Sequence, residues 1–179
     1  GSGSGGTNGD DDDENKGPKP SVIAFDAVIS DKVSPFVAAC NDINLAEMGD
    51  IATAAYAAMR SFIDMASLCY KPGEISEQQA LAKPMIDQIR KAGECKNDAR
   101  RTPTEYHWSS FSEALSGSLG WTLTSGIAGI PPPYKAIQEG AIDGAMFYIN
   151  KVRKDHKGEA TQDAWVKSLL QMLNAIRDY

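Results

Sequence analysis

Histidine and cysteine are scarce in this 179-residue sequence, which has two of the first and three of the second. His107 and His156 fall on different predicted helices, and Cys40, Cys69 and Cys95 are far apart in the chain. No His-x-x-x-His or Cys-x-x-Cys spacing is present, so the sequence offers no zinc site. An odd, dispersed set of cysteines indicates reduced thiols in a reducing compartment, most simply the cytosol.

The sequence also lacks the patterns that accompany catalysis, membrane insertion or nucleic-acid binding. Ser118 misses the spacing of a nucleophile elbow, and His107 is predicted to be an exposed or core-edge imidazole rather than a catalytic base. No apolar run approaches the roughly 18 residues of a membrane span, no signal peptide is visible, and the net charge of −6 shows no basic excess. We therefore expect a non-enzymatic cytoplasmic domain, with no cofactor, no metal, no nucleic acid and no transmembrane segment.

Residues 1–20 differ in composition from the rest of the chain. They are rich in Gly, Ser, Asn, Asp and Pro and carry one acidic run, from Asp10 to Glu14. Such a segment cannot bury enough apolar surface to offset the entropy lost on ordering, which predicts a disordered acidic Gly/Ser linker over 1–20. The run also lacks the alternating ligands and the glycine of a calcium loop. The folded domain is expected over 21–179.

From Val22 onward, apolar residues recur at helical spacing, and no segment alternates as a strand would. An apolar connection is expected over 120–129, and Pro84 is expected either to start a new helix or to kink one. Helices are predicted from a start at Asp31–Pro35 to about Ile43, over 47–70, over 76–101 with a break at Ala82–Lys83, from Thr102–Glu105 to about Leu119, over 134–155 and over 160–178. Six helices with short connections make an all-α, antiparallel six-helix bundle the expected fold.

Three of these helices have an apolar stripe that we assign to the core. Alanines in the helix over 47–70 also favour helix and permit close approach of a neighbour. The predicted core residues are Ile51, Ala55, Ala58, Phe62, Met65 and Cys69 on that helix, Ile137, Ala141, Ala145, Tyr148 and Val152 on the helix over 134–155, and Trp165, Leu169, Met172 and Ile176 on the last helix.

A proline turn opens the helix over 134–155. Residues 131–134, Pro-Pro-Pro-Tyr, fit the short Pro-Pro-x-Tyr pattern that WW modules bind. The interpretation we favour is a stiff connector, whose last proline presets the backbone for a helix N-terminus. Such a loop would still hold Tyr134 and Lys135 in fixed positions, which suits an interface hot spot.

Basic residues gather at the other end of the same helix, about five turns away. Lys151, Arg153, Lys154 and Lys157 lie within two turns of one another. They fit either a solvated face that interacts with the helix dipole or a positive patch that steers an acidic partner. A similar group lies at another helix end, with the same two interpretations: Arg90, Lys91, Lys96, Arg100 and Arg101.

An ordered set of short segments resembles the N-terminal helical domain of cyclase-associated proteins. The segments are Phe25-Asp26-Ala27-Val28-Ile29, Leu119-Gly120-Trp121, Pro133-Tyr134, residues 145–152 and Trp165-Val166-Lys167. The resemblance covers residues 21–179. It implies a six-helix antiparallel bundle that acts on actin together with cofilin, engages cofilin-decorated filament ends and promotes subunit removal. It also implies a link to adenylyl cyclase through a segment upstream of this one.

The resulting hypothesis is a regulator of actin filament depolymerisation at the cell cortex, connected with cell polarity, whose partners are actin and cofilin. Homodimer formation stays open. The partner-binding residues, chosen for charge and rigidity, are Pro131, Pro132, Pro133, Tyr134, Lys135, Asn150, Lys151, Arg153 and Lys154. The alternative is an adaptor that recruits WW-type or other signalling modules through the Pro131–Tyr134 motif.

Overall fold

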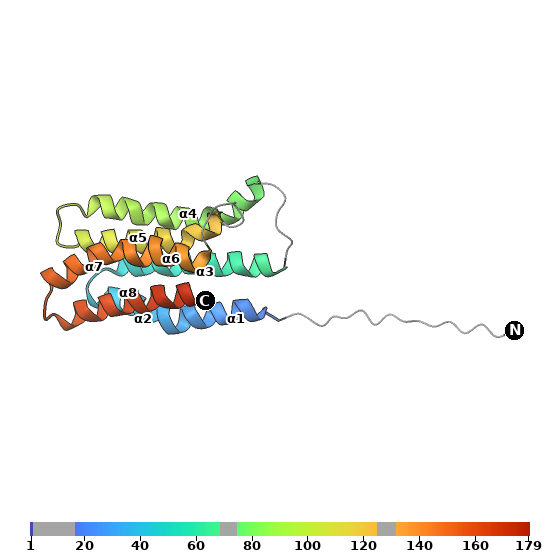
Figure 1. Cartoon of the computed structure of the whole chain (residues 1–179), viewed down its shortest axis with the longest axis horizontal. Helices are drawn as coiled ribbons and strands as arrows, with labels where there is room; N and C mark the ends of the chain where they lie inside the picture. Colours follow the sequence, from blue (N-terminus) through green and yellow to red (C-terminus); the bar gives the residue numbers. More distant parts are fainter. Residues whose placement is uncertain (2–16, 69–74, 125–131) are drawn as a thin grey trace.

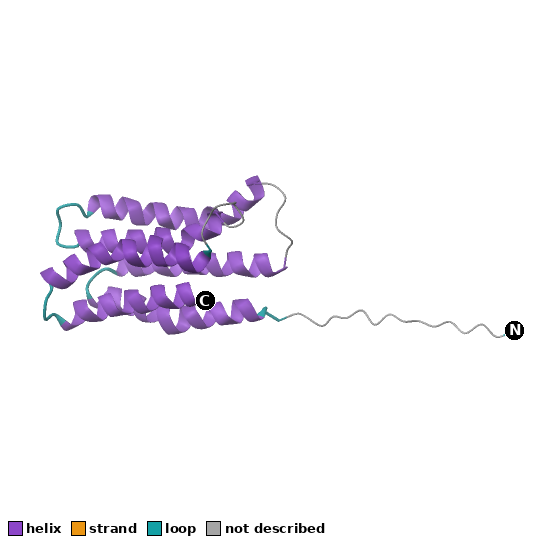
Figure 2. Ribbon diagram, in the orientation of Figure 1, coloured by secondary structure: helices purple, strands orange, loops and turns teal. Residues whose placement is uncertain are grey.

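The computed structural model describes residues 1, 17–68, 75–124 and 132–179. In this part of the chain six helical rods lie along one another and no strand is present (Figure 1, Figure 2). The rods are α1 (Pro20–Val28) with η1 (Ile29–Val33) and α2 (Ser34–Asp42), α3 (Ala46–Leu68), α4 (Ile75–Asp98), α5 (Glu105–Thr124), α6 (Pro133–Ile137) with η2 (Gln138–Asp143) and α7 (Gly144–Asp155), and α8 (Ala160–Asp178). The all-α, antiparallel six-helix bundle is confirmed.

The first rod is continuous from Pro20 to Asp42, so the predicted helix start at Asp31–Pro35 is wrong. The π-helical turn η1 ends two residues before Pro35 and takes up the place where the missing N–H of the proline would interrupt an α-helical ladder. There the Ser34 hydroxyl donates a hydrogen bond to the carbonyl oxygen of Ile29, at 3.2 Å. Pro20, the last residue of the expected linker, already belongs to α1.

Helix α4 passes through Pro84 without the predicted break at Ala82–Lys83. The N-terminal part of α4 is inclined to the remainder of the helix, so the proline kinks it (Figure 1). Ala82 and Met85 are both buried, and packing on both sides of the proline holds the two parts together. The expected connection over 120–129 is also revised, because α5 continues to Thr124; residues 125–129 lie outside the described part.

The predicted core is confirmed on the last helix and partly corrected on α3. Every assigned residue of α8 is buried: Trp165, Leu169, Met172 and Ile176. On α3, Ala58 and Phe62 are only half-buried and Met65 is 40% exposed, because they line an open apolar groove toward α4. The buried side of α3 instead carries Tyr56, whose hydroxyl lies 2.7 Å from that of Ser118 on α5. Cys69 lies outside the described residues.

The fifth rod buries most of its predicted stripe. Ile137, Ala141, Ala145 and Val152 are buried, whereas Tyr148 is half-buried because it lies at the edge of the bundle beside Lys96 of α4. The tightest approach in this rod is between η2 and α5, where Gly117 of α5 lies directly against the backbone of η2. This contact fixes the position of the whole rod on the bundle.

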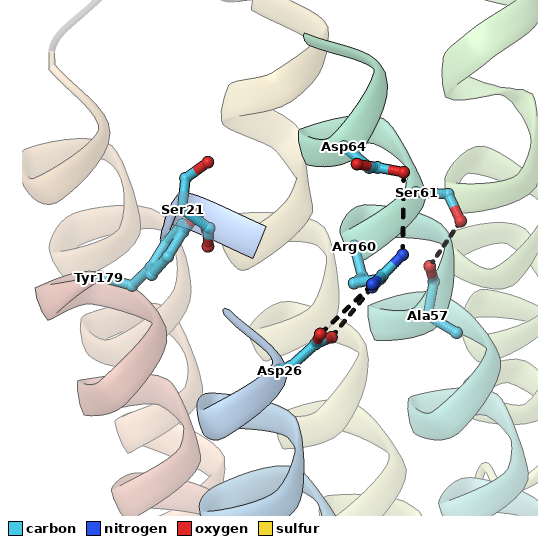
Figure 3. A network of polar contacts seen from close by, with 7 residues as sticks. All are labelled: Ser21, Asp26, Ala57, Arg60, Ser61, Asp64 and Tyr179. Carbon is cyan, nitrogen blue, oxygen red and sulfur yellow. Dashed lines mark hydrogen bonds and ion pairs between the residues drawn. The ribbon is translucent and has the colours of Figure 1, made fainter. Parts of the chain in front are cut away.

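The start of α1 and the C-terminus are fastened to the bundle near each other. The Arg60 side chain of α3 forms two hydrogen bonds with the carboxylate of Asp26, at 2.9 and 3.3 Å, and lies 3.9 Å from Asp64 (Figure 3). The hydrogen bonds from Arg60 lower the pKa of the Asp26 carboxyl below its usual value. At the C-terminus, the Tyr179 hydroxyl donates to the carbonyl oxygen of Ser21, at 2.9 Å. These contacts hold α1 against α3 and α8.

The opposite end of the bundle is made of three connections, 43–45, 99–104 and 156–159 (Figure 1). Each contains one residue in the left-handed backbone region: Asn44 with φ 60°, Arg101 with φ 61° and Gly158 with φ 87°. Such a residue stops a helix and turns the chain back. Asparagine and glycine adopt this conformation readily, but an arginine there carries some backbone strain.

Candidate functional site

The predicted site residues lie at the two ends of the fifth rod and do not form one surface. Tyr134 is the second residue of α6, and Arg153 lies in the last turn of α7. These two positions are nineteen residues apart in the sequence, which corresponds to about 28 Å along a helix. Asn150, Lys151 and Lys154 belong to the α7 end, whereas Pro132, Pro133 and Lys135 belong to the α6 end. Pro131 lies outside the described residues.

At the α6 end, the geometry agrees with the connector interpretation. Pro132 is extended, with φ −60° and ψ 155°, and Pro133 is the first helical residue. The Tyr134 ring is 56% exposed, and the guanidinium of Arg177 lies over it at 5.0 Å. Lys135 pairs with Glu139 at 3.7 Å. WW modules bind an extended polyproline conformation, and Tyr134 is helical, so the described part of this motif does not have the shape of such a ligand.

At the α7 end, cations from two parts of the sequence converge. The end of α4 and the connection after it bring Lys96, Arg100 and Arg101 to the same end of the bundle as the last turns of α7 (Figure 1). We call this set the basic end; its residues are Lys96, Arg100, Arg101, Lys151, Arg153, Lys154 and Lys157. In the sequence these two parts are separate clusters. Helix direction is the signal that could have joined them, because the third and fifth helices of an antiparallel bundle run the same way.

Aromatic rings hold part of the basic end in place. The Lys151 ammonium lies 4.9 Å from the centre of the Tyr106 ring on α5 and 5.0 Å from that of Phe147 on α7. Lys96 lies 5.9 Å from the centre of the Tyr148 ring. Cation–π contacts of this kind are worth about 0.5–1 kcal/mol each at exposed sites. They link α4, α5 and α7, and the Phe147 ring itself is 63% exposed.

Most cations of the basic end have no carboxylate partner. Lys96 lies 3.8 Å from Glu113 of α5. The other six residues of the basic end form no ion pair within the described part of the chain. Asp155 and Glu159 lie nearby in the sequence, and Glu159 pairs with His156 at 3.1 Å. The unpaired cations are therefore available to an acidic partner, whereas Lys135 at the α6 end is already paired.

The two histidines, 49 positions apart in the sequence, meet beneath the basic end. Their ring centres are 5.2 Å apart, and the His107 ring also packs on Trp165 at 5.0 Å. His107 is only 2% exposed, and its Nε2 donates to the amide oxygen of Gln162, at 2.7 Å. Its Nδ1 has no hydrogen-bond partner among the described residues. The prediction of an exposed or core-edge His107 is therefore wrong, because the imidazole is buried against Trp165.

The domain should lose stability as the pH falls through the range of histidine titration. Burial, and then the neighbouring His156, lower the pKa of His107 below its usual value of 6.5, despite the opposing hydrogen bond to Gln162 and the nearby Asp155 and Glu159. As the pH falls, the unfolded chain therefore takes up the proton first. The contribution of neutral His107 to the free energy of unfolding is complete above pH 6.5 and declines below it, by at most about 1.4 kcal/mol per pH unit.

Urea unfolding at pH 7.5, 6.5 and 5.5 measures this slope. His107→Gln removes the titrating group and should flatten the slope. An unchanged slope in His107→Gln would assign the pH dependence to other groups.

Residues 25–179 match the family model for the CAP N-terminal domain. The chain belongs to this family. In this CAP N-terminal domain the segments that suggested the resemblance lie largely in the core, since Phe25, Leu119, Ile149, Val152 and Trp165 are all buried.

Curated relatives agree with this assignment. Adenylyl cyclase-associated protein 2 of Mus musculus is 33% identical over 172 residues, which cover 92% of this chain and 34% of that protein. Adenylyl cyclase-associated protein 1 of Homo sapiens is 27% identical over 166 residues, which cover 91% of this chain and 33% of that protein. The chain therefore spans about a third of the length of the curated relatives it matches.

Two solved structures share the fold. A crystal structure of the N-terminal domain of CAP, described as indicating variable oligomerisation, superposes with a TM-score of 0.78 at 24% identity and covers 92% of this chain and 86% of that one. The N-terminal domain of the adenylyl cyclase-associated protein from Dictyostelium discoideum superposes with a TM-score of 0.77 at 24% identity. That match covers 88% of this chain and 87% of the other. Within residues 17–68, 75–124 and 132–179, no helix is long and apolar enough to cross a membrane, and no three metal-ligating side chains are grouped around a common point.

Proposed function

We propose that this CAP N-terminal domain is a non-enzymatic regulator of actin dynamics, which binds cofilin-decorated filament ends and promotes filament disassembly and subunit turnover. It would work in the cytoplasm, at the cortical actin cytoskeleton, as part of a larger protein linked to adenylyl cyclase signalling. The observation that carries the proposal is the family match over residues 25–179. The unpaired cations of the basic end give it a surface on which to act.

The basic end is the stronger of the two candidate docking surfaces. Arg153 and Lys154 are exposed and have no ion-pair partner in the described chain, so an acidic partner would not have to displace an existing carboxylate. Lys151 is already held between two rings, which lowers the entropy that binding would cost. Binding at this end would loosen a terminal subunit only if the domain prefers the loosened conformation, because a ligand shifts an equilibrium by its differential affinity.

Removing two cations from the basic end should slow cofilin-dependent depolymerisation. We expect Arg153→Ala/Lys154→Ala to weaken binding to decorated filaments by roughly tenfold, which corresponds to about 1.4 kcal/mol. The salt dependence of this binding should not become steeper. Both side chains are exposed, so the free energy of unfolding should stay within about 0.5 kcal/mol of wild type. The measurement is the filament depolymerisation rate with cofilin at subsaturating domain concentration.

Lys167→Ala is the matched control, since Lys167 is an exposed cation without an ion pair in the described chain and lies in the middle of α8. It should depolymerise filaments at the wild-type rate. A second arm with Tyr134→Ala tests the proline turn separately. Wild-type rates for Arg153→Ala/Lys154→Ala would remove the basic end from the docking surface, and loss in Tyr134→Ala alone would move that surface to the α6 end.

A further inference from the structure

An exposed aromatic ring lies among the cations of the basic end. Phe147 of α7 is 63% exposed, although it is a large apolar side chain. Its ring meets the Tyr148 ring edge-on, with centres 5.1 Å apart, and Lys151 lies between it and Tyr106. A single apolar side chain on a surface is common and needs no explanation. Three neighbouring rings instead form an aromatic patch, and aromatic residues are enriched at the centres of protein interfaces.

Phe147 and two cations without ion pairs follow one ridge of α7. Lys151 comes four residues after Phe147, and Lys154 three residues after Lys151, and these steps place side chains on the same face of a helix. Neither cation forms an ion pair in the described part of the chain. A partner that lies along this ridge therefore covers an apolar ring and two positive charges together.

This combination limits the chemistry of the partner. Covering Phe147 also takes the Lys151 ammonium out of water, because the ammonium lies 5.0 Å from the centre of the ring. A desolvated cation without a carboxylate is costly, so a purely apolar partner surface does not fit. A polyanion without apolar groups would leave the ring in water and gain nothing from it. The surface that satisfies both side chains carries a large apolar side chain with a carboxylate beside it.

We propose that Phe147 is the apolar anchor of the basic end, and that the segment it binds is acidic and carries a large apolar side chain next to a carboxylate. The inference deepens the proposed function and rests on it for the identity of the partner, the cofilin-decorated filament. The two kinds of contact act at different stages. The cations attract an acidic surface from a distance and govern association, whereas the ring is buried only in the docked complex and governs dissociation.

Single-molecule fluorescence of the labelled full chain on cofilin-decorated filaments measures both rates. Phe147→Ser should dissociate roughly tenfold faster than wild type, because one buried apolar side chain is lost. Its association rate should stay within about twofold of wild type, with the same salt dependence. Arg153→Ala/Lys154→Ala should show the opposite pattern, slower association with a weaker salt dependence. A Phe147→Ser protein that dissociates at the wild-type rate overturns the inference.

Phe147→Leu separates contact with the partner from the hold of the ring on Lys151. Leucine keeps a large apolar side chain but offers no aromatic face to the ammonium. Its residence time on the filament should therefore stay within about threefold of wild type. A residence time as short as that of Phe147→Ser would mean that the ring only positions Lys151, and the apolar anchor would be refuted.

Ile23→Ser is the matched control for exposed apolar surface. Ile23 is 56% exposed and lies on α1, which begins at the end of the bundle opposite to the basic end (Figure 1). This variant should dissociate at the wild-type rate. A loss equal to that of Phe147→Ser would show that exposed apolar surface in general holds the domain on the filament, and the ridge on α7 would have no special role.

Two short Glu-rich peptides test the chemistry of the partner in the absence of actin. They have the same charge, and one has a central leucine where the other has serine. In fluorescence anisotropy, the leucine peptide should bind the wild-type chain roughly tenfold more tightly, and Phe147→Ser should abolish this preference. Equal affinities for wild type would overturn the inference and leave the proposed actin function as it stands. Wild-type chain that prefers the leucine peptide but does not bind decorated filaments would overturn the proposed function alone.

Discussion

A single methyl group at position 117 is expected to cost the domain about 3 kcal/mol or more of its free energy of unfolding. A Cβ atom on Gly117 would collide with the backbone of Gly140 and Ala141 in η2. The obstacle is main chain rather than the end of a flexible side chain, so no rotamer change can relieve it. The fifth rod would have to move away from α5 and would lose packing along its buried residues.

Gly117→Ala measured by urea unfolding, with helicity followed by circular dichroism, tests this expectation. Gly93→Ala is the matched control, because Gly93 also lies inside a helix, α4, and a Cβ there meets nothing within 4 Å. Alanine is the better helix former, so this variant should gain roughly 0.5–1 kcal/mol. A Gly117→Ala protein within 1 kcal/mol of wild type would mean that the two rods do not approach as closely as described.

The sequence predicts the all-helical fold well, and also the bounds and the core of the most regular helix, because apolar periodicity reports directly on a buried face. Helix α8 shows this most clearly, since its predicted bounds and its four core residues agree with the structure. The π-helical turns η1 and η2 could not be predicted in the same way. They change the register of the backbone hydrogen bonds but leave the apolar residues at nearly helical spacing, so the periodicity does not reveal them. Without knowledge of η1, the proline that follows it, Pro35, is mistaken for a helix start.

The correction on α3 has a different cause. A helix with alanines on several sides has more than one apolar stripe, and the pattern alone does not say which stripe faces the bundle. Ala58, Phe62 and Met65 form one stripe, and Tyr56, Met59 and Ile63 form another. The second is buried because Tyr56 reaches Ser118 of α5, a contact between residues 62 positions apart that no local pattern contains.

The candidate site was predictable as residues but not as a surface. Lys151, Arg153 and Lys154 are visible in the sequence as one cluster, whereas Arg100 and Arg101 join them only through the third and fifth helices running in the same direction. The proline turn was chosen for its rigidity and this cluster for its charge, and a separation of about five helical turns left open whether they share a surface. The continuous fifth rod keeps them at its two ends.

Replacing Trp165 by alanine should destabilise the domain by about 3–5 kcal/mol, the other large effect expected in this fold. The Trp165 ring is fully buried on α8 and packs against Phe36 of α2, with ring centres 6.1 Å apart, and against His107 of α5 at 5.0 Å. It also neighbours the Cys40 thiol, whose pKa burial raises to about 12. One side chain therefore holds three rods together beneath the basic end, and its loss leaves a cavity that none of them can fill without moving.

Trp165→Phe separates the loss of packing from the loss of the indole nitrogen. That nitrogen forms no hydrogen bond of good geometry among the described residues, although its interaction with the Cys40 thiol lowers the pKa of that group against the effect of burial. A thiol is a weak acceptor, so removing the indole nitrogen leaves no strong polar group unsatisfied. Phenylalanine keeps a ring against Phe36 and His107, and we expect a cost of only about 1–2 kcal/mol. Urea unfolding followed by circular dichroism measures both variants. If Trp165→Phe were as costly as Trp165→Ala, the indole nitrogen with its contact to the Cys40 thiol, rather than packing, would be the cause of the loss.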